Sequence, residues 1–308
     1  MATPPTITRC FIHSPPSRTY YGPLSSPDQR STRLSRYNSS FRRAFDLGGG
    51  VNDNDSCRSC LPILIGGSDL AGVHLDRDQL EAFSRYCELL QRANREVNLT
   101  AVREPAGIIR TLFLDSLALI AVLSQEEWPR EDGLDIVDIG SGAGIPGLAL
   151  AIAMPVWHIS MVESVGKKAR FIQTVIDTIG QKNAGVHAVR AEDLARRPEQ
   201  RDAYGLATAR AVAPLATLIE LCAPFVRRGG MLLFPKGGGI DAEFAAAAPA
   251  AKALALDIGA IERAPRDIGL DSDRVIVRYE KLGPTPPPFP RRVGLARSKP
   301  IGVWSARG

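Results

Sequence analysis

The sequence predicts an α/β fold, in which a mostly parallel sheet is covered by helices on both faces and preceded by a short helical N-terminal subdomain. Two observations support this expectation. From residue 134 onward, short apolar runs alternate with segments of helical length, which is the pattern of parallel strands joined by covering helices. Before residue 130, apolar residues recur every three to five positions, which is the spacing of an amphipathic helix.

The chain divides into four regions by composition and pattern. We expect residues 1–69 to be a disordered extension, because they are rich in Ser, Pro, Arg and Asn and show no sustained periodicity. A start codon placed too far upstream, a dispensable extension, an organelle transit peptide and an RNA-binding arm all stay open for this region. We expect a helical subdomain at 70–130, the α/β domain at 131–282 and a basic, proline-rich tail at 283–308.

Two helices are expected in the helical subdomain. The first has one apolar face, takes Asp76 or Asp78 as its N-cap and ends at the segment 98–100. The second begins at Pro105, a residue type that suits the first helical turn, and runs to Leu123. Neither helix is long enough to be stable alone, so we expect both to pack on the α/β domain.

The α/β domain is expected to alternate strands and helices in chain order, ending in a late strand. The expected strands are 134–139, 158–163, 186–190, 206–210, 231–234 and 274–280. The expected helices are 146–154, 167–179, 214–225 and 244–256.

Charge and cysteine content limit the classes of function. The net charge of +5 comes from the two ends, because residues 1–70 hold eight Arg against five Asp, and residues 283–308 hold four Arg and one Lys without an acid. A basic tail favours a polyanionic partner such as RNA. Five scattered cysteines are not a disulfide framework, so we expect a reducing compartment. No apolar run is long enough to predict a membrane span.

The glycine-rich segment from Asp138 to Gly147 follows the first strand and opens a helix. Glycines there allow a sharp turn and the close approach of a ligand to the backbone. The spacing from Gly142 to Gly147 formally matches a dinucleotide fingerprint, but two residues separate the strand from its first glycine. Counted from Gly140 and led by Asp138, the segment resembles the first motif of class I methyltransferases, which have a Rossmann-like fold.

That resemblance implies S-adenosylmethionine as the cofactor. It places the carboxylate of Asp138 at the cationic end of the cofactor and the open backbone of the loop around its amino acid and ribose. Glu163 ends the second strand, where a carboxylate can accept hydrogen bonds from both ribose hydroxyls. Glu192 follows the third strand, at a position that flanks the adenine in methyltransferases and that a dinucleotide enzyme does not require. The loop residues implied in cofactor binding are Gly140, Gly142, Gly144 and Ile145.

Several motifs together resemble the ribosomal RNA small subunit methyltransferase G family, also called glucose-inhibited division protein B. The resemblance runs from about Leu80 to Pro300. The most specific piece is the ending, Pro290-Arg291-Arg292-Val293-Gly294 followed by Arg297-Ser298-Lys299-Pro300. Family members commonly carry Arg-His just before the Leu-Asp-Ser of the second helix, where this chain has Thr111 and Leu112. The other matching pieces are 98–101, 114–117, 138–147, 163–168, 190–193, 210–211 and 236–237.

The family resemblance implies transfer of a methyl group to N7 of one guanosine in 16S rRNA of the small ribosomal subunit. Guanine N7 has a lone pair and no proton, so the reaction requires positioning and no general base, and no catalytic residue is singled out. We expect no metal, no membrane partner, a monomer and a cytoplasmic location. Cofactor contacts are implied at Gly140, Ile145, Ala191, Glu192 and Arg210, and the candidates for RNA contact are Lys236, Arg291, Arg292, Arg297 and Lys299.

Three other functions stay open at this point. A small-molecule methyltransferase would not need a basic tail. An NAD(P)-dependent oxidoreductase would need a proton donor such as a Tyr-Lys pair, and Tyr204 stands without a helical Lys partner. A non-catalytic RNA-binding protein on the same fold would be expected to have a damaged cofactor loop, and this loop is intact.

Overall fold

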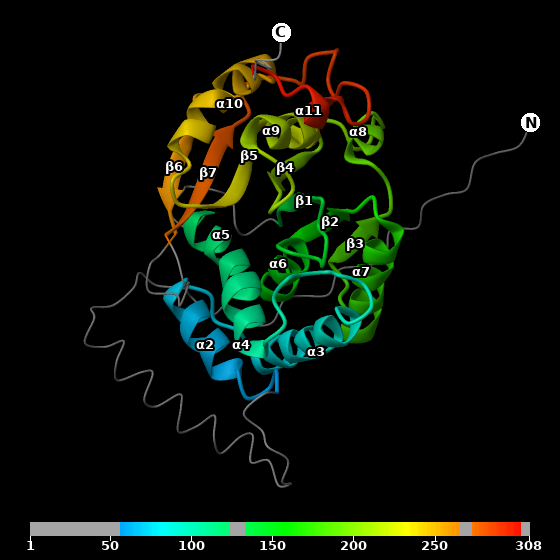
Figure 1. The fold of residues 1–308 in the computed structure, drawn as a ribbon, viewed down its shortest axis with the longest axis vertical. Coiled ribbons are helices and arrows are strands. Elements are labelled where there is room, and N and C mark those ends of the chain that lie inside the picture. The colour runs from blue at the N-terminus through cyan, green and yellow to red at the C-terminus, as the bar shows by residue number, and fades with distance from the viewer. Residues whose placement is uncertain (1–55, 124–132, 265–272, 303–308) are drawn as a thin grey trace, which may run out of the picture. The chain divides into compact units, whose positions relative to one another are not determined.

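The computed structural model describes residues 56–123, 133–264 and 273–302 (Figure 1). Within these residues seven strands form one sheet in the order β3-β2-β1-β4-β5-β7-β6. The strands are β1 (Asp135–Ile139), β2 (His158–Val162), β3 (Ala184–His187), β4 (Tyr204–Thr208), β5 (Val226–Gly237), β6 (Ala260–Arg263) and β7 (Arg274–Glu280).

Strand direction defines where a ligand can bind. The five strands β3, β2, β1, β4 and β5 are parallel, and β7 is antiparallel to both β5 and β6. The first three strands of the chain lie in the order β1, β2, β3 toward one edge of the sheet, and the next strand, β4, lies on the opposite side of β1. Such a reversal leaves a crevice outside the carboxyl ends of β1 and β4, where ligands of open α/β sheets bind. The predicted mostly parallel, Rossmann-like α/β fold is confirmed.

Helices cover both faces of the sheet (Figure 1). On one face α9 and α10 pack on the sheet through a continuous apolar cluster. On the other face α6 contacts β1 and β2, and α3 and α5 pack on α6. The helices are α2 (Leu61–Leu70), α3 (Arg77–Ala93), α4 (Pro105–Ile108), η2 (Ile109–Leu114), α5 (Asp115–Leu123), α6 (Gly147–Ala153), α7 (Gly166–Ile179), α8 (Ala191–Leu194), α9 (Leu215–Cys222), η3 (Ala223–Phe225), α10 (Asp241–Ala253) and α11 (Leu295–Ser298).

Regular structure begins earlier than the sequence predicts. The expected extension covers residues 1–69, whereas α2 occupies Leu61–Leu70, buries Leu61 and Leu64 and contacts η2. A disulfide joins Cys57 to Cys87 in α3, with the two Cα atoms 5.9 Å apart. The sequence shows no disulfide framework, and this one bond joins residues that lie 30 positions apart, so no local spacing indicated it.

The helical segment 105–123 is the buried centre of the N-terminal subdomain. It passes from α4 through the π-helical η2 into α5, and all nine residues of α5 are buried. By length and hydropathy it is the one helix of the described residues that would suffice to cross a membrane. Because 78% of its most apolar window is buried inside the protein, its apolar character is explained by core packing.

The C-terminal segment 283–302 is tied to the body of the protein. The guanidinium of Arg201 donates hydrogen bonds to the carbonyl oxygens of Thr285, Pro286 and Phe289 at 2.6–3.2 Å. The hydroxyl of Thr217 in α9 donates to the carbonyl of Ala296 at 3.0 Å. The region that composition marks as a basic tail therefore packs on α9 over these residues.

Candidate functional site

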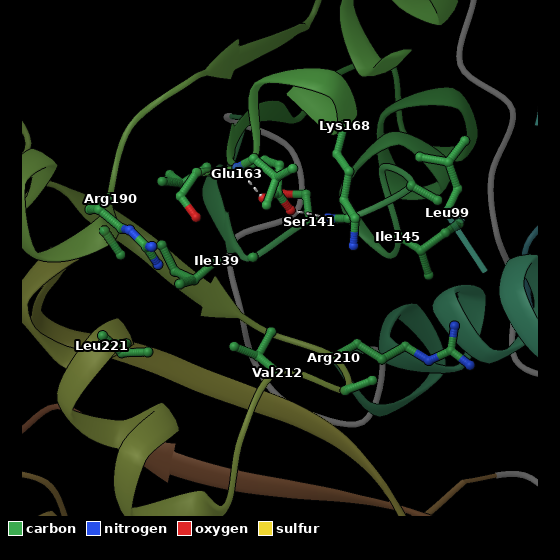
Figure 2. Close-up of a pocket in the computed structure, with 18 of the residues that line it drawn as sticks. Leu99, Ile139, Ser141, Ile145, Glu163, Lys168, Arg190, Arg210, Val212 and Leu221 are labelled. Atoms are coloured by element: carbon green, nitrogen blue, oxygen red, sulfur yellow. Dashed lines mark hydrogen bonds between the residues drawn. The ribbon is translucent and has the colours of Figure 1, made fainter. Parts of the chain in front are cut away.

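A pocket of about 720 Å³ lies at the carboxyl ends of β1, β2 and β4 (Figure 2). Its volume is within the range of small-molecule and cofactor sites. Seven of the nine residues expected to bind the cofactor line it, namely Gly140, Gly142, Ile145, Glu163, Ala191, Glu192 and Arg210. The other two, Asp138 and Gly144, are not among its lining residues.

Gly140 makes the turn that opens the pocket. Its φ is +72°, a left-handed conformation that strongly favours glycine, and its backbone N–H donates to the carbonyl of Val162 at 2.8 Å. A Cβ at this position would lie 2.7 Å from Cγ2 of Val212, across the loop. Glycine is therefore required here both by backbone conformation and by the close approach of the loop after β4.

Asp138 stabilises the glycine-rich loop by a hydrogen bond from a buried position. Its side chain is fully buried, and its Oδ2 accepts a hydrogen bond from the N–H of Gly147 at 3.0 Å. Burial raises the pKa of Asp138 to about 7, against the opposing effects of the hydrogen bonds from Gly147 and Ser141. The resemblance implies that this carboxylate lies at the cationic end of the cofactor, whereas in the structure its fully buried side chain does not line the pocket and binds the N–H of Gly147.

Gly144 has a packing role that the sequence does not reveal. A Cβ there would lie 3.0 Å from the hydroxyl of Tyr86 and 3.2 Å from Cβ of Leu148. The Tyr86 hydroxyl donates to the carbonyl of Ala143 at 2.5 Å, and the ring stacks on Phe113 with centroids 5.0 Å apart. Helix α3 thus anchors the glycine-rich loop directly, which gives the N-terminal helices a function in building the site.

Glu163 is held with its carboxylate at the pocket. One carboxylate oxygen accepts from the N–H of Gly142 at 2.9 Å and the other from the N–H of Val165 at 2.7 Å. A carboxylate has about four acceptor sites, so two hydrogen bonds leave acceptor capacity on both oxygens. A pair of ribose hydroxyls is the kind of ligand that such a fixed carboxylate binds.

Glu192 connects the pocket with the C-terminal segment. Its Oε1 accepts a hydrogen bond from the N–H of Gly294 at 2.8 Å. Both Gly294 and Arg297 line the pocket, and Arg297 donates to the carbonyl of Val212 at 3.0 Å. The sequence places Arg297 in an RNA-facing strip, and the structure places it at the pocket wall.

Arg210 lies at the end of β4, across the pocket from Glu163 and Ser141 (Figure 2). Its Nε lies 2.9 Å from Oδ2 of Asp115, and its Nη2 donates to the carbonyl of Thr111 at 2.5 Å. Asp115 also pairs with Arg274, whose Nε lies 3.2 Å from Oδ1. Burial lowers the pKa of Arg210 and raises the pKa of Asp115, and in each case the ion pair opposes the effect of burial.

The loop 99–102 is a part of the pocket wall that site prediction missed. The side chain of Asn94 shapes it, because its Oδ1 accepts from the N–H groups of Leu99 and Thr100 and its Nδ2 donates to the carbonyl of Thr100. The sequence contains a signal for this loop, because the segment 98–101 is one of the pieces that resemble the family, although it is expected only at a helix end and not in the site.

Besides Arg297, which is exposed but donates to the carbonyl of Val212, two of the five candidates for RNA contact are half-buried and paired with acidic side chains. The Lys236 ammonium donates to Glu243 at 2.8 Å and to the carbonyl of Ala213 at 3.2 Å. Arg291 makes a bidentate pair with Glu220, a carboxylate that is only 1% exposed. The expectation that these two side chains face RNA is therefore not supported by the structure, whereas Arg292, Arg297 and Lys299 are exposed.

Metal binding has no support in residues 56–123, 133–264 and 273–302, where no group of three or more His, Cys, Asp or Glu side chains could hold an ion. The titratable side chains that line the pocket are Glu163, Lys168, Arg190, Glu192, Arg210 and Arg297.

Comparison with known proteins gives one consistent result. The family described as rRNA small subunit methyltransferase G (GidB) matches residues 79–261. The chain is 41% identical over 230 residues to the ribosomal RNA small subunit methyltransferase G of Roseiflexus castenholzii, covering 75% of this chain and 95% of that one. It is 38% identical over 239 residues to the protein of the same name from Chloroflexus aggregans, covering 78% of this chain and 97% of that one.

Proposed function

Because this chain belongs to the rRNA small subunit methyltransferase G family, we propose that it transfers the methyl group of S-adenosylmethionine to N7 of a guanosine in 16S rRNA. The single observation that carries the proposal is the pocket at the carboxyl ends of β1, β2 and β4, in which the glycine-rich loop and Glu163 lie side by side. Neither an oxidoreductase nor a small-molecule methyltransferase is favoured by family membership.

The pocket suits this cofactor along its length. Glu163 and the loop at Gly140 and Gly142 would hold the ribose and the amino acid part, with Ile145 beside them. Ala191 and Glu192 would lie at the adenine, which requires Glu192 to serve the adenine while it also accepts the hydrogen bond from Gly294. Asp138 would act indirectly, by keeping Gly147 and the loop in place.

Methylation of guanine N7 suits a site built for positioning. The bound cofactor supplies an electrophilic methyl group, and the N7 lone pair needs no deprotonation. The protein has to hold the base so that N7, the methyl carbon and the sulfur are nearly in line, which accounts for most of the rate enhancement. The fixed carboxylate of Glu163 and the guanidinium of Arg210, on opposite sides of the pocket, would set the two limits of that space.

The substrate is an RNA, so exposed cations are expected near the pocket mouth. Arg190 is exposed and lines the pocket, and Arg292 and Lys299 are exposed on the C-terminal segment. We expect the double variant Arg292→Ala/Lys299→Ala to lower RNA affinity and to reduce its salt dependence. Affinity that is unchanged at several salt concentrations would remove these two side chains from the interface.

We further propose that the enzyme acts as a cytoplasmic monomer. Its substrate class supports this location, and the long apolar helix 105–123 is buried in the core. Sedimentation at several protein concentrations tests the monomer.

The deciding experiment is transfer of labelled methyl from S-adenosylmethionine to purified small ribosomal subunits that lack the modification. We expect label in 16S rRNA, recovered as 7-methylguanosine after nucleoside analysis. Label in another nucleoside would change the target atom and keep the enzyme class. No transfer, together with no cofactor binding by calorimetry, would overturn the proposal.

A further inference from the structure

We propose that Arg297 is a further cofactor-binding residue, whose guanidinium covers the adenosine part of S-adenosylmethionine from the C-terminal segment 283–302. The proposal rests on the proposed function, because it names one more contact for the cofactor of that reaction. Sequence analysis places Arg297 in an RNA-facing strip together with Arg291, Arg292 and Lys299. In the structure Arg297 lines the pocket, whereas the other three residues do not.

Three hydrogen bonds fix the short helix α11, which carries Arg297. Glu192 accepts from the N–H of Gly294, directly before α11, at 2.8 Å. Thr217 in α9 donates to a carbonyl within α11 at 3.0 Å, and the Arg297 guanidinium donates through Nη2 to the carbonyl of Val212 at 3.0 Å. All three contacts are made within the protein, so they preorganise the Arg297 side chain and lower the entropy cost of binding a ligand with it.

The hydrogen bond to Val212 places the Arg297 guanidinium at the pocket wall beside the glycine-rich loop. A Cβ at Gly140 would lie 2.7 Å from Cγ2 of Val212, so the loop and Val212 are in close contact. Figure 2 shows Val212 across the pocket from Glu163, the proposed ribose ligand. Because α11 begins at the hydrogen bond to Glu192, where the adenine is proposed to lie, Arg297 extends from the adenine end toward the ribose.

A guanidinium suits the adenosine part better than the reacting end of the cofactor. Its flat face stacks on aromatic rings, and adenine is such a ring. Nε and Nη1 of Arg297 are not in the contact with Val212, so they can donate to ring nitrogens or ribose oxygens. The sulfonium of the cofactor is positive, and a second cation beside it would be repelled. The geometry and the charge therefore both assign Arg297 to the adenosine.

Calorimetric titration with S-adenosylhomocysteine, the cofactor without its methyl group, measures this contact. We expect Arg297→Ala to raise the Kd about 10-fold, as for the loss of a cation stacked on an aromatic ring. Arg297→Lys keeps the positive charge but lacks the flat surface, so we expect most of that loss. The matched control is Arg228→Ala, which removes the same charge from an exposed position at the start of β5, outside the pocket, and should leave the Kd within a factor of about two.

A second ligand locates the contact along the cofactor. Methylthioadenosine has the adenosine part and lacks the amino acid part, and its Kd is obtained by competition with S-adenosylhomocysteine. We expect Arg297→Ala to raise this Kd by the same factor, because the lost contact lies on the adenosine. A loss confined to S-adenosylhomocysteine, or no competition by methylthioadenosine in the wild type, would overturn the assignment to the adenosine.

The outcomes separate this proposal from the proposed function. A wild-type protein that neither binds S-adenosylhomocysteine nor transfers methyl overturns both. A wild type that does both, with an unchanged Kd in Arg297→Ala, overturns the role of Arg297 alone. If that variant instead loses RNA affinity and salt dependence, Arg297 belongs to the RNA interface that sequence analysis expected. Should Arg297→Ala not fold, as checked by circular dichroism, an unchanged Kd in Arg297→Lys overturns the proposal.

Discussion

Removing the guanidinium of Arg291 is predicted to destabilise the fold. Arg291 makes a bidentate pair with Glu220 in α9, and its Nη2 also donates to the carbonyl of Lys299 at 2.8 Å. Arg291→Ala would leave a 1%-exposed carboxylate without its partner, which costs about 3–5 kcal/mol. For a domain of this size, that loss corresponds to a fall in Tm of about 6–20 °C.

Thermal and urea unfolding monitored by circular dichroism measures the effect. The neighbouring Arg292 is exposed, so Arg292→Ala is the matched control and should change the unfolding free energy by less than about 0.5 kcal/mol. Adding Glu220→Gln to Arg291→Ala removes the unpaired charge and should recover part of the loss. The reasoning is refuted if Arg291→Ala keeps the stability of the wild type and only weakens RNA binding, which is the behaviour that sequence analysis expected.

Three further predictions concern the loop and the N-terminal helices. The pKa of Asp138 is raised to about 7 in the folded protein, so folding favours the protonated form of this side chain. The unfolding free energy of the wild type, measured by urea relative to Asp138→Asn, should therefore fall as the pH rises from about 4 to 7. A difference between the two proteins that does not change with pH would contradict this. Gly140→Ala should weaken cofactor binding at least tenfold by calorimetry, and more than Gly142→Ala, because both have positive φ but only the first meets a side chain within 3 Å. Peptide mapping under non-reducing conditions should recover the peptide of Cys57 linked to that of Cys87, and unlinked peptides would rule out the bond. Reduction of the bond should lower the free energy of unfolding by up to about 3–4 kcal/mol for a loop of this length.

The sequence was sufficient for the parts of the fold that depend on local pattern. The strand before the glycine-rich loop, that loop and the first turn of α3 with its Asp76 cap are all set by residues close together in the chain. β6 was missed because it is four residues long and half-buried at the sheet edge, so it shows no apolar alternation. α2 was missed because it lies in a region dominated by polar composition.

The site was predictable in its residues and less so in their roles. Glycine spacing and the acids after β2 and β3 identified residues of which most line the pocket, although the pocket has many further lining residues that they did not indicate. The partner of an ionisable side chain, however, is decided by tertiary contacts. Arg291 and Arg297 stand six positions apart in one basic stretch, yet one pairs with a buried acid and the other lines the pocket. No pattern within the stretch distinguishes them, because Glu220 is 71 residues away from Arg291.

The part of the pocket wall formed by Gly294 and Arg297 has a consequence for biosynthesis and genetics. These residues follow β7 in the chain, so a nascent chain in which the seven strands of the described residues are complete still lacks one side of its ligand site. A nonsense mutation after Leu282 would leave the entire family-matching segment 79–261 and all seven strands of the described residues in place. Screens for loss of activity should therefore recover truncations between Leu282 and Gly294 whose products retain the sheet but bind the methyl donor poorly.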